Sequence, residues 1–416
     1  MGKNKTQYKK TRLDNGIRVV SEKIPYVRSI SIGAWLTVGS RDENKTNNGI
    51  SHYIEHMMFK GTKNRKAYEI AESLESVGGQ INAFTGKELT CYYAHILDEH
   101  LAIAVDVISD ILIHSIFDEQ EMEKEKQVIV EEINNMEDTP EEMIHELFIK
   151  DLFPNHPLGF STLGTRENVW SFTRQDIYDY LNRNYAKNRL VIAAAGNVDH
   201  DKLVELVETK FLDFHNCVDR VINPPNGPRQ GENIIKNGGI QAHICLGTLA
   251  YSYRDPKKFP LLILNTLLGA GMSSRLFQNI REKHGLAYSV YSFIDFLFDT
   301  GLFGVYIGTD KNKIGASIEL INKELEDLKK NPVSEEELER TKNQLKGNLM
   351  LGLESTSSRM TRLAKMEIYL QQYYTLDDTL REIDKVQIED ILAVANELFN
   401  KDRIFTTILK PQKSNV

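Results

Sequence analysis

A short stretch, Ser51–Met58, carries the residues best suited to chemistry. It reads S-H-Y-I-E-H-M-M, so His52 and His56 stand four residues apart with Glu55 between them. On an α-helix, positions i, i+3 and i+4 share a face, which predicts that these three side chains point the same way. Two imidazoles at that spacing can hold one metal ion, and a carboxylate beside them can accept a proton.

Two histidines at this spacing can also be ordinary surface or core residues. The context favours metal binding, because apolar residues fill the other positions of the expected helix: Ile50, Tyr53, Ile54, Met57 and Met58. Both sides of the helix are therefore expected to be buried, where two histidines and a glutamate are costly unless they are paired or bound to a metal. The order H-x-x-E-H is also the inverzincin signature, the reverse of the H-E-x-x-H motif.

A third ligand is expected from a helix that begins at Asp118 with the N-cap pattern D-x-x-E and runs to about Glu137. Glu132 shares a mostly apolar face with Glu125, Val128, Ile129 and Met136, whereas its neighbour Glu131 shares a polar face with Lys124, Gln127 and Asn135. We therefore expect Glu132 to be the buried carboxylate and Glu131 to be solvated. A set of two histidines and Glu132 would leave zinc a fourth position for water.

The composition describes an ordinary globular protein. The 416 residues suffice for two domains, and 41% are hydrophobic and 26% charged. A net charge of −8 without a basic stripe argues against nucleic-acid binding. The three cysteines, Cys91, Cys217 and Cys245, form no C-x-x-C motif, so we expect buried, inert thiols and a reducing compartment.

No membrane role is expected. The basic N-terminus, MGKNKTQYKKTR, precedes no apolar segment that would make it a secretory signal, and no apolar run approaches the length of a membrane span. We therefore expect a soluble, cytoplasmic protein.

The order of the expected elements indicates a duplicated α+β fold. Paired strands around the Asn15-Gly16 turn, the histidine helix and strands near 80–85 and 89–96 open a catalytic domain at 1–222. A loop-rich linker is expected at 223–239, followed by a degenerate repeat at 240–416. Aligning Ser334 with Asp118 places Asn348 opposite Glu132 and Thr341 opposite Glu125, so only the first copy keeps the ligands.

Four segments in order resemble the pitrilysin (insulinase) family of zinc peptidases, nearest to the mitochondrial processing peptidase β subunit and its bacterial relatives. They are G-I-S-H-Y-I-E-H-M-M-F-K-G-T, G-G-Q-I-N-A-F-T, E-K-Q-V-I-V-E-E and L-F-Q-N-I-R-E-K-H-G-L-A-Y-S-V-Y-S. The resemblance covers nearly the whole chain. It implies two homologous domains of the processing-peptidase type, each an antiparallel-rich mixed sheet packed with helices.

The resemblance also implies roles for individual residues. His52, His56 and Glu132 would bind one zinc ion per chain, and Glu55 would be the general base. Glu125 would orient a ligand through a hydrogen bond. An extended substrate would add as a β-strand along Asn82, Ala83 and Phe84, and Arg281 and Tyr288 would contact the substrate backbone and the developing oxyanion.

The expected function is zinc-dependent endoproteolysis of unfolded peptides inside a clamshell chamber. Since insulinase-length chains hold four domain copies and this one holds two, the resemblance suggests a homodimer with composite active sites. The loop Leu268-Gly-Ala-Gly-Met272 is much shorter than the glycine-rich loop of the processing peptidase α subunit, which argues against presequence-type specificity. The alternatives are a non-catalytic scaffold and one subunit of a heterodimeric processing peptidase.

Overall fold

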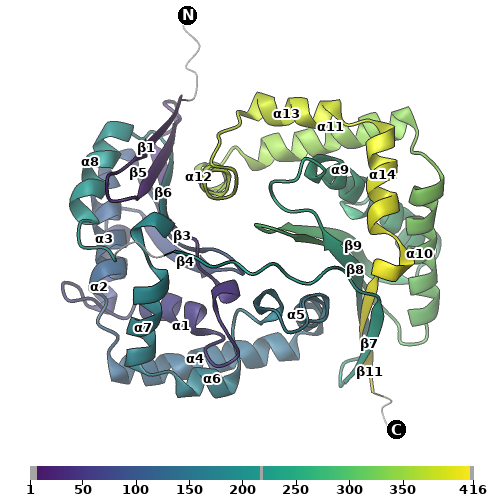
Figure 1. The fold of residues 1–416 in the computed structure, drawn as a ribbon, viewed down its shortest axis with the longest axis horizontal. Coiled ribbons are helices and arrows are strands. Elements are labelled where there is room, and N and C mark those ends of the chain that lie inside the picture. The colour runs from purple at the N-terminus through teal and green to yellow at the C-terminus, as the bar shows by residue number, and fades with distance from the viewer. Residues whose placement is uncertain (1–6, 216–218, 413–416) are drawn as a thin grey trace, which may run out of the picture. The chain divides into compact units, whose positions relative to one another are not determined.

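The computed structural model describes residues 7–215 and 219–412, which form two compact units (Figure 1). The first, termed the N-unit, takes Met1–Asn134, Phe160–Ile222 and Gly352–Tyr373. The second, termed the C-unit, takes Asn135–Gly159, Asn223–Leu351 and Tyr374–Val416. Cys217 and residues 1–6 of the basic N-terminal stretch lie outside the described residues.

The N-unit is built on a six-stranded mixed sheet in the order β1-β2-β6-β3-β5-β4. Its strands are β1 (Gln7–Arg12), β2 (Arg18–Lys23), β3 (Ser29–Leu36), β4 (Gln80–Thr85), β5 (Thr90–Leu97) and β6 (Leu190–Gly196). β2 and β6 are parallel, and every other neighbouring pair is antiparallel. The hairpin expected around Asn15-Gly16 is confirmed as β1 and β2.

Helices cover both faces of this sheet. The helices of the N-unit are α1 (Ile50–Met57), α2 (Ala67–Glu75), α3 (Leu101–His114), α4 (Glu119–Asp138), α6 (Arg166–Ser171), α7 (Arg174–Asn184), α8 (His200–Lys210) and α12 (Thr356–Lys365). α3 packs against one face of β3, whereas α12, which comes from the second half of the sequence, packs against the sheet at β2, β3 and β6 (Figure 1). β3 is therefore buried along nearly its whole length.

The C-unit repeats this plan with a five-stranded mixed sheet in the order β7-β11-β8-β10-β9. Its strands are β7 (Gly231–Asn237), β8 (Ala242–Ala250), β9 (Ala287–Phe296), β10 (Gly301–Thr309) and β11 (Phe405–Pro411). β7 and β11 are the parallel pair, as β2 and β6 are in the N-unit. The match of strand order and direction supports the duplication inferred from the sequence.

The helices of the C-unit are α5 (Pro140–Leu152), α9 (Lys258–Gly269), α10 (Ile314–Lys330), α11 (Glu335–Gly352), α13 (Leu376–Lys385) and α14 (Ile388–Leu398), with a π-helix η5 (Phe277–Lys283). α5, from the first half of the sequence, packs against β8 and β11. Its apolar residues Ile144, Phe148 and Leu152 join a buried cluster with Cys245 and Tyr306.

The compact units differ in two respects from the contiguous ranges expected from the sequence. Each unit takes one helix from the other half of the chain, α5 or α12, because the apolar face of that helix completes the other unit's core. In addition, β7 lies inside the range 223–239 that was expected to be a loop-rich linker. Its alternating exposure and few apolar residues are typical of an edge strand, which the sequence pattern did not distinguish from a loop.

No helix among the described residues is long and apolar enough to cross a membrane. Cys91 and Cys245 are free and buried, as expected. Burial raises the pKa of both thiols well above its ordinary value, which keeps them unreactive.

The packing of α12 on the N-unit sheet can be tested by removing one buried side chain. Met360 is buried and its sulfur lies beside Gly33 of β3, so we expect Met360→Ala to lower the free energy of unfolding by about 2–5 kcal/mol. Both tryptophans, Trp35 and Trp170, belong to the N-unit, so tryptophan fluorescence during denaturation reports its unfolding.

Met350→Ala on α11 is the matched control, because Met350 is 42% exposed. We expect that change to stay within about 0.5 kcal/mol. Equal effects of the two substitutions would contradict a structural role for α12 in the N-unit core.

Candidate metal centre

Helix α1 presents the H-x-x-E-H motif on one side and buries the other. Ile50, Tyr53, Ile54 and Met57 are fully buried, as expected, whereas His52, Glu55 and His56 are partly exposed. The helix begins after Gly49, whose φ of 98° suits glycine. The buried carboxylate of Glu43 accepts hydrogen bonds from the backbone N–H groups of Gly49 and Ser51 at 2.8 and 2.9 Å, so it satisfies donors at the helix N-terminus.

The structure brings the three expected ligands together. Oε2 of Glu132 lies 3.7 Å from Nε2 of His52 and 3.7 Å from Nε2 of His56. A tetrahedral zinc ion with bonds of about 2.0–2.1 Å would place neighbouring ligand atoms about 3.3 Å apart, so the donor set fits zinc after small shifts. Among the described residues, this is the one group of three or more His, Cys, Asp or Glu side chains that could hold a metal.

The expected burial of Glu132 is wrong. Its side chain is 39% exposed, and Val128, one turn earlier, is 45% exposed, whereas the Glu125 side chain is only 7% exposed. This face of α4 is covered at Glu125 and open at Val128 and Glu132. An apolar pattern cannot distinguish a covered helix face from one beside an accessible site. Glu131 is exposed, as expected.

Glu125 contacts His56, one of the expected ligands. Oε1 of Glu125 lies 2.9 Å from Nδ1 of His56, and Oε2 lies 2.7 Å from Nζ of Lys60. Burial would raise the pKa of Glu125, but these two hydrogen bonds outweigh burial and lower its pKa. Since an ionised carboxylate can only accept, Nδ1 of His56 carries the proton and Nε2 keeps its lone pair for a metal.

The two histidines have different surroundings. Burial, followed by the charge of His56, lowers the pKa of His52 to about 3, so His52 is neutral and can act as a ligand. Burial also opposes protonation of His56, but the hydrogen bond to Glu125 and the charges of Glu132, Glu125 and Glu55 raise its pKa overall. Nδ1 of His52 is buried and has no hydrogen-bond partner, so of these two histidines only His56 is oriented by a carboxylate at Nδ1.

Glu55 shares the face of α1 with both histidines and is held by the edge strand. The hydroxyl of Thr85, the last residue of β4, donates to Oε2 of Glu55 at 2.5 Å. Burial raises the pKa of Glu55, the bond from Thr85 and the charge of His56 oppose this, and the charge of Glu132 adds to the increase. A carboxylate with a raised pKa and a fixed orientation is suited to accept a proton near neutral pH.

The strand β4, which holds Asn82, Ala83 and Phe84, is an edge of the N-unit sheet. It pairs with β5 on one side only, and its residues are alternately exposed and half-buried. Phe84 packs edge-on against Trp35, with ring centroids 5.4 Å apart. The free side of β4 offers backbone groups that an extended peptide could pair with.

Arg281 and Tyr288 lie together in the C-unit. The guanidinium of Arg281, on η5, lies 4.7 Å from the ring centroid of Tyr288 and 4.6 Å from that of Phe277. Tyr288, on the edge strand β9, is 80% exposed. The structure therefore joins these two residues to each other in the C-unit, and it joins the metal ligands, Glu55, Glu125 and β4 in the N-unit.

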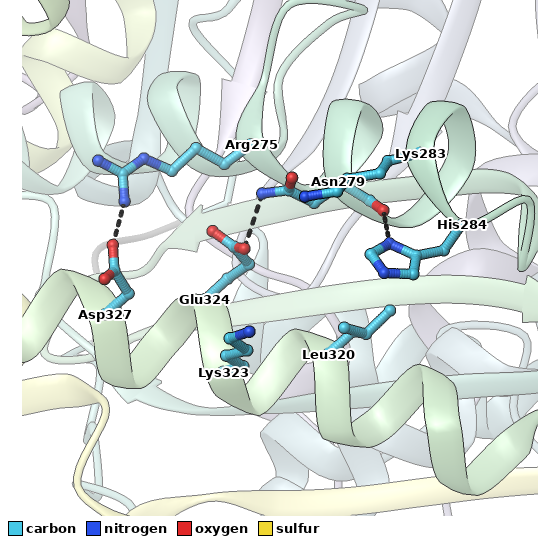
Figure 2. A pocket seen from close by; sticks show the side chains of 8 residues that line it. All are labelled: Arg275, Asn279, Lys283, His284, Leu320, Lys323, Glu324 and Asp327. Atoms are coloured by element: carbon cyan, nitrogen blue, oxygen red, sulfur yellow. Dashed lines mark hydrogen bonds and ion pairs between the residues drawn. The ribbon is translucent and has the colours of Figure 1, made fainter.

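The helix that carries Arg281 is fixed to α10 beside a polar groove of 380 Å³ (Figure 2). Arg275, just before η5, pairs with Asp327 at 2.8 Å, and Asn279 donates to Glu324 at 2.7 Å. These contacts between the two helices hold η5 in place on the C-unit.

Sequence reasoning missed Thr85, Lys60 and Phe277. Thr85 is the last residue of the expected strand, and Lys60 lies four residues after His56, as one helical turn would place it. Neither has a residue type that indicates chemistry by itself. Their roles depend on contacts with Glu55 and Glu125, which only the tertiary structure reveals.

Two family models match the chain. One described as "Insulinase (Peptidase family M16)" matches residues 18–166, and one described as "Peptidase M16 inactive domain" matches residues 171–345. The first range contains the metal group and Glu55, and the second contains Arg281 and Tyr288. This division agrees with a duplicated fold in which one copy keeps the ligands.

Relatives and solved structures match nearly the full chain. The "Uncharacterized zinc protease YmxG" of Bacillus subtilis is 43% identical over 95% of this chain and 96% of its own length. The "Uncharacterized zinc protease SCO5738" of Streptomyces coelicolor is 39% identical over 97% of this chain and 90% of its own. The crystal structure of a protease from Helicobacter pylori has a TM-score of 0.91 at 27% identity and covers 98% of this chain and 100% of that one.

A further structure shows likeness in fold alone. It is a peptidase M16 inactive domain from Pseudomonas fluorescens, with a TM-score of 0.91 at 19% identity over 97% of this chain and 98% of that one. The expected α+β fold with two homologous domains is confirmed. The family models together match most of the chain, and full-length relatives share about two-fifths of its residues, so this chain belongs to the insulinase family, peptidase family M16.

Proposed function

We propose that the protein is a zinc-dependent endopeptidase that hydrolyses unfolded peptides. The observation that carries this proposal is the geometry on the N-unit. The ligand atoms of His52, His56 and Glu132 lie within 4.8 Å of one another, and Glu55 stands on the same helix face as both histidines. The names of the relatives, which call them zinc proteases, support the metal and the reaction class.

The residues divide the chemistry among them. His52, His56 and Glu132 would hold the zinc ion, which supplies a Lewis acid that polarises the scissile carbonyl and favours deprotonation of water near pH 7. Glu55 accepts the proton of the attacking water and passes it to the leaving amine. The hydroxyl of Thr85 fixes one oxygen of Glu55, so the carboxylate keeps its orientation during both transfers.

The edge strand would bind the substrate. An extended peptide pairs with the free side of β4 along Asn82–Phe84, mainly through backbone hydrogen bonds, so sequence selectivity is expected to be broad. This pairing requires an extended segment whose backbone groups are not already paired, which an unfolded peptide supplies along its whole length. Tyr288, assisted by Arg281, donates to the developing oxyanion, a type of contact worth about 3–4 kcal/mol elsewhere.

We propose further that the enzyme is a homodimer whose active sites combine the N-unit of one chain with Tyr288 and Arg281 of its partner. The exposure of Tyr288 supports a contact with the substrate, because a tyrosine that is 80% exposed on an edge strand is free to meet one. The alternative of a non-catalytic scaffold is less favoured, because the N-unit retains the three expected metal ligands and the expected base. A heterodimer subunit remains the second alternative, and sizing the protein expressed alone separates it from a homodimer.

The role of Glu55 is tested by Glu55→Gln. We expect kcat/KM for an unfolded peptide to fall at least about 10²-fold, because glutamine cannot accept the proton. Zinc content measured on the same samples should remain one per chain, since Glu55 is not a ligand. Substantial remaining activity would remove Glu55 from the mechanism.

The ligand set is tested by His56→Ala and Glu132→Ala. Each removes one of three protein ligands, so we expect purified protein to lose most of its zinc by elemental analysis. Glu131→Ala is the matched control, because Glu131 adjoins Glu132 on α4 but is exposed to solvent. Stoichiometric zinc in the Glu132→Ala protein would show that Glu132 is no ligand.

The composite site is tested by mixing two inactive variants, Glu55→Gln and Tyr288→Phe. A mixed dimer with composite sites contains one site with both native residues, so we expect mixing under exchange conditions to restore activity. If Glu55 and Tyr288 act within one chain, every site in the mixture keeps a defect and no activity returns. Size-exclusion chromatography of each variant provides the dimer control.

A further inference from the structure

Lys60 lies directly behind the metal centre. It follows α1 by one turn, and its Nζ is 2.7 Å from Oε2 of Glu125. The other oxygen, Oε1, is 2.9 Å from Nδ1 of His56. The carboxylate of Glu125 is therefore held at one oxygen by a metal ligand and at the other by a lysine that takes no part in the proposed reaction.

The two contacts fix Glu125 because little water reaches it. The Glu125 side chain is 7% exposed, and that of Lys60 is 30% exposed. If Lys60 were removed, a buried carboxylate oxygen would lose its partner, which is costly. The carboxylate would then turn toward the solvent and weaken its hold on Nδ1 of His56.

We propose that Lys60 is a positioning residue for the metal centre, which acts through Glu125 to orient His56 toward the metal. This inference rests on the metal site of the proposed function, but it concerns a residue that contacts neither metal nor substrate. Lys60, Glu125 and His56 form a chain of two contacts, from the segment after α1 to α4 and back to α1.

The charge of Lys60 considered alone predicts the opposite change in metal affinity. A lysine is a positive charge that repels a cation bound nearby, so the loss of this repulsion alone should strengthen metal binding when Lys60 is removed. If Lys60 acts by positioning, its removal should weaken binding, because His56 is no longer held in the orientation that a metal needs. The sign of the change therefore separates the two effects.

The test is the zinc affinity of the metal-free protein, measured by competition with a chromophoric chelator. We expect Lys60→Met to weaken zinc binding about tenfold, at the lower end of the range for partners of metal ligands. Lys124→Met is the matched control, because the Lys124 side chain is 67% exposed and pairs with Glu121 at 2.6 Å rather than with Glu125. The zinc affinity of this variant should equal that of the wild type.

A double-mutant cycle shows whether Lys60 acts through Glu125. In a Glu125→Gln background, Lys60→Met should cause no further loss, since the carboxylate it orients is gone. Additive losses, unchanged affinity or tighter binding in Lys60→Met would each overturn the inference. The zinc affinity of Lys60→Gln, which also removes the charge but keeps a polar side chain, is measured together with that of Lys60→Met. Circular dichroism of each metal-free variant tests whether it is folded.

This experiment also separates the inference from the proposed function. A wild-type protein that binds no zinc would contradict the metal centre itself. A wild-type protein that binds zinc, together with a Lys60→Met variant of equal affinity, would contradict only the role of Lys60.

Discussion

The metal centre depends on the packing of α1 against α4, two helices that lie far apart in the sequence. The hydroxyl of Tyr53 on α1 donates to the backbone carbonyl of Met122 on α4 at 3.0 Å, and both residues are buried. This contact sets the spacing at which Glu132 can meet His52 and His56. Because α1 is short, the buried apolar residues on its other side must supply the rigidity that keeps three polar side chains on one accessible face.

The duplicated fold places the candidate metal ligands in the N-unit and the Arg281–Tyr288 pair in the C-unit. β4 and β9 hold corresponding positions in the two sheets, and each is a free edge of its own sheet. In the N-unit that edge adjoins Glu55 through Thr85, whereas in the C-unit it carries Tyr288. The same topological position therefore carries different side chains in the two units. The exchange of α5 and α12 means that neither unit completes its core from one half of the chain, so the halves are expected to fold together.

Much of this site could be predicted from the sequence because the ligands obey local rules. Helical spacing placed His52, Glu55 and His56 on one face, and face analysis chose Glu132 over Glu131. The exposure of Glu132 could not be predicted, since it depends on which part of α4 other elements leave open. Three other features also depend on tertiary packing: the exchange of α12, the strand β7 in an apparent linker, and the contacts of Thr85 and Lys60. The periodicity of apolar residues in the sequence does not indicate any of them.

The charges around the site favour a divalent ion. Lys60 compensates Glu125, so the uncompensated negative charges on the site face are those of Glu132 and Glu55. These two carboxylates repel each other, as the contribution of Glu132 to the raised pKa of Glu55 indicates. An ion of charge +2 would balance both, while two imidazoles and one carboxylate select zinc over harder cations such as Mg²⁺ or Ca²⁺. Without the lysine the site would attract a cation more strongly but would hold His56 less firmly, so charge and orientation make opposing demands that Glu125 and Lys60 meet together.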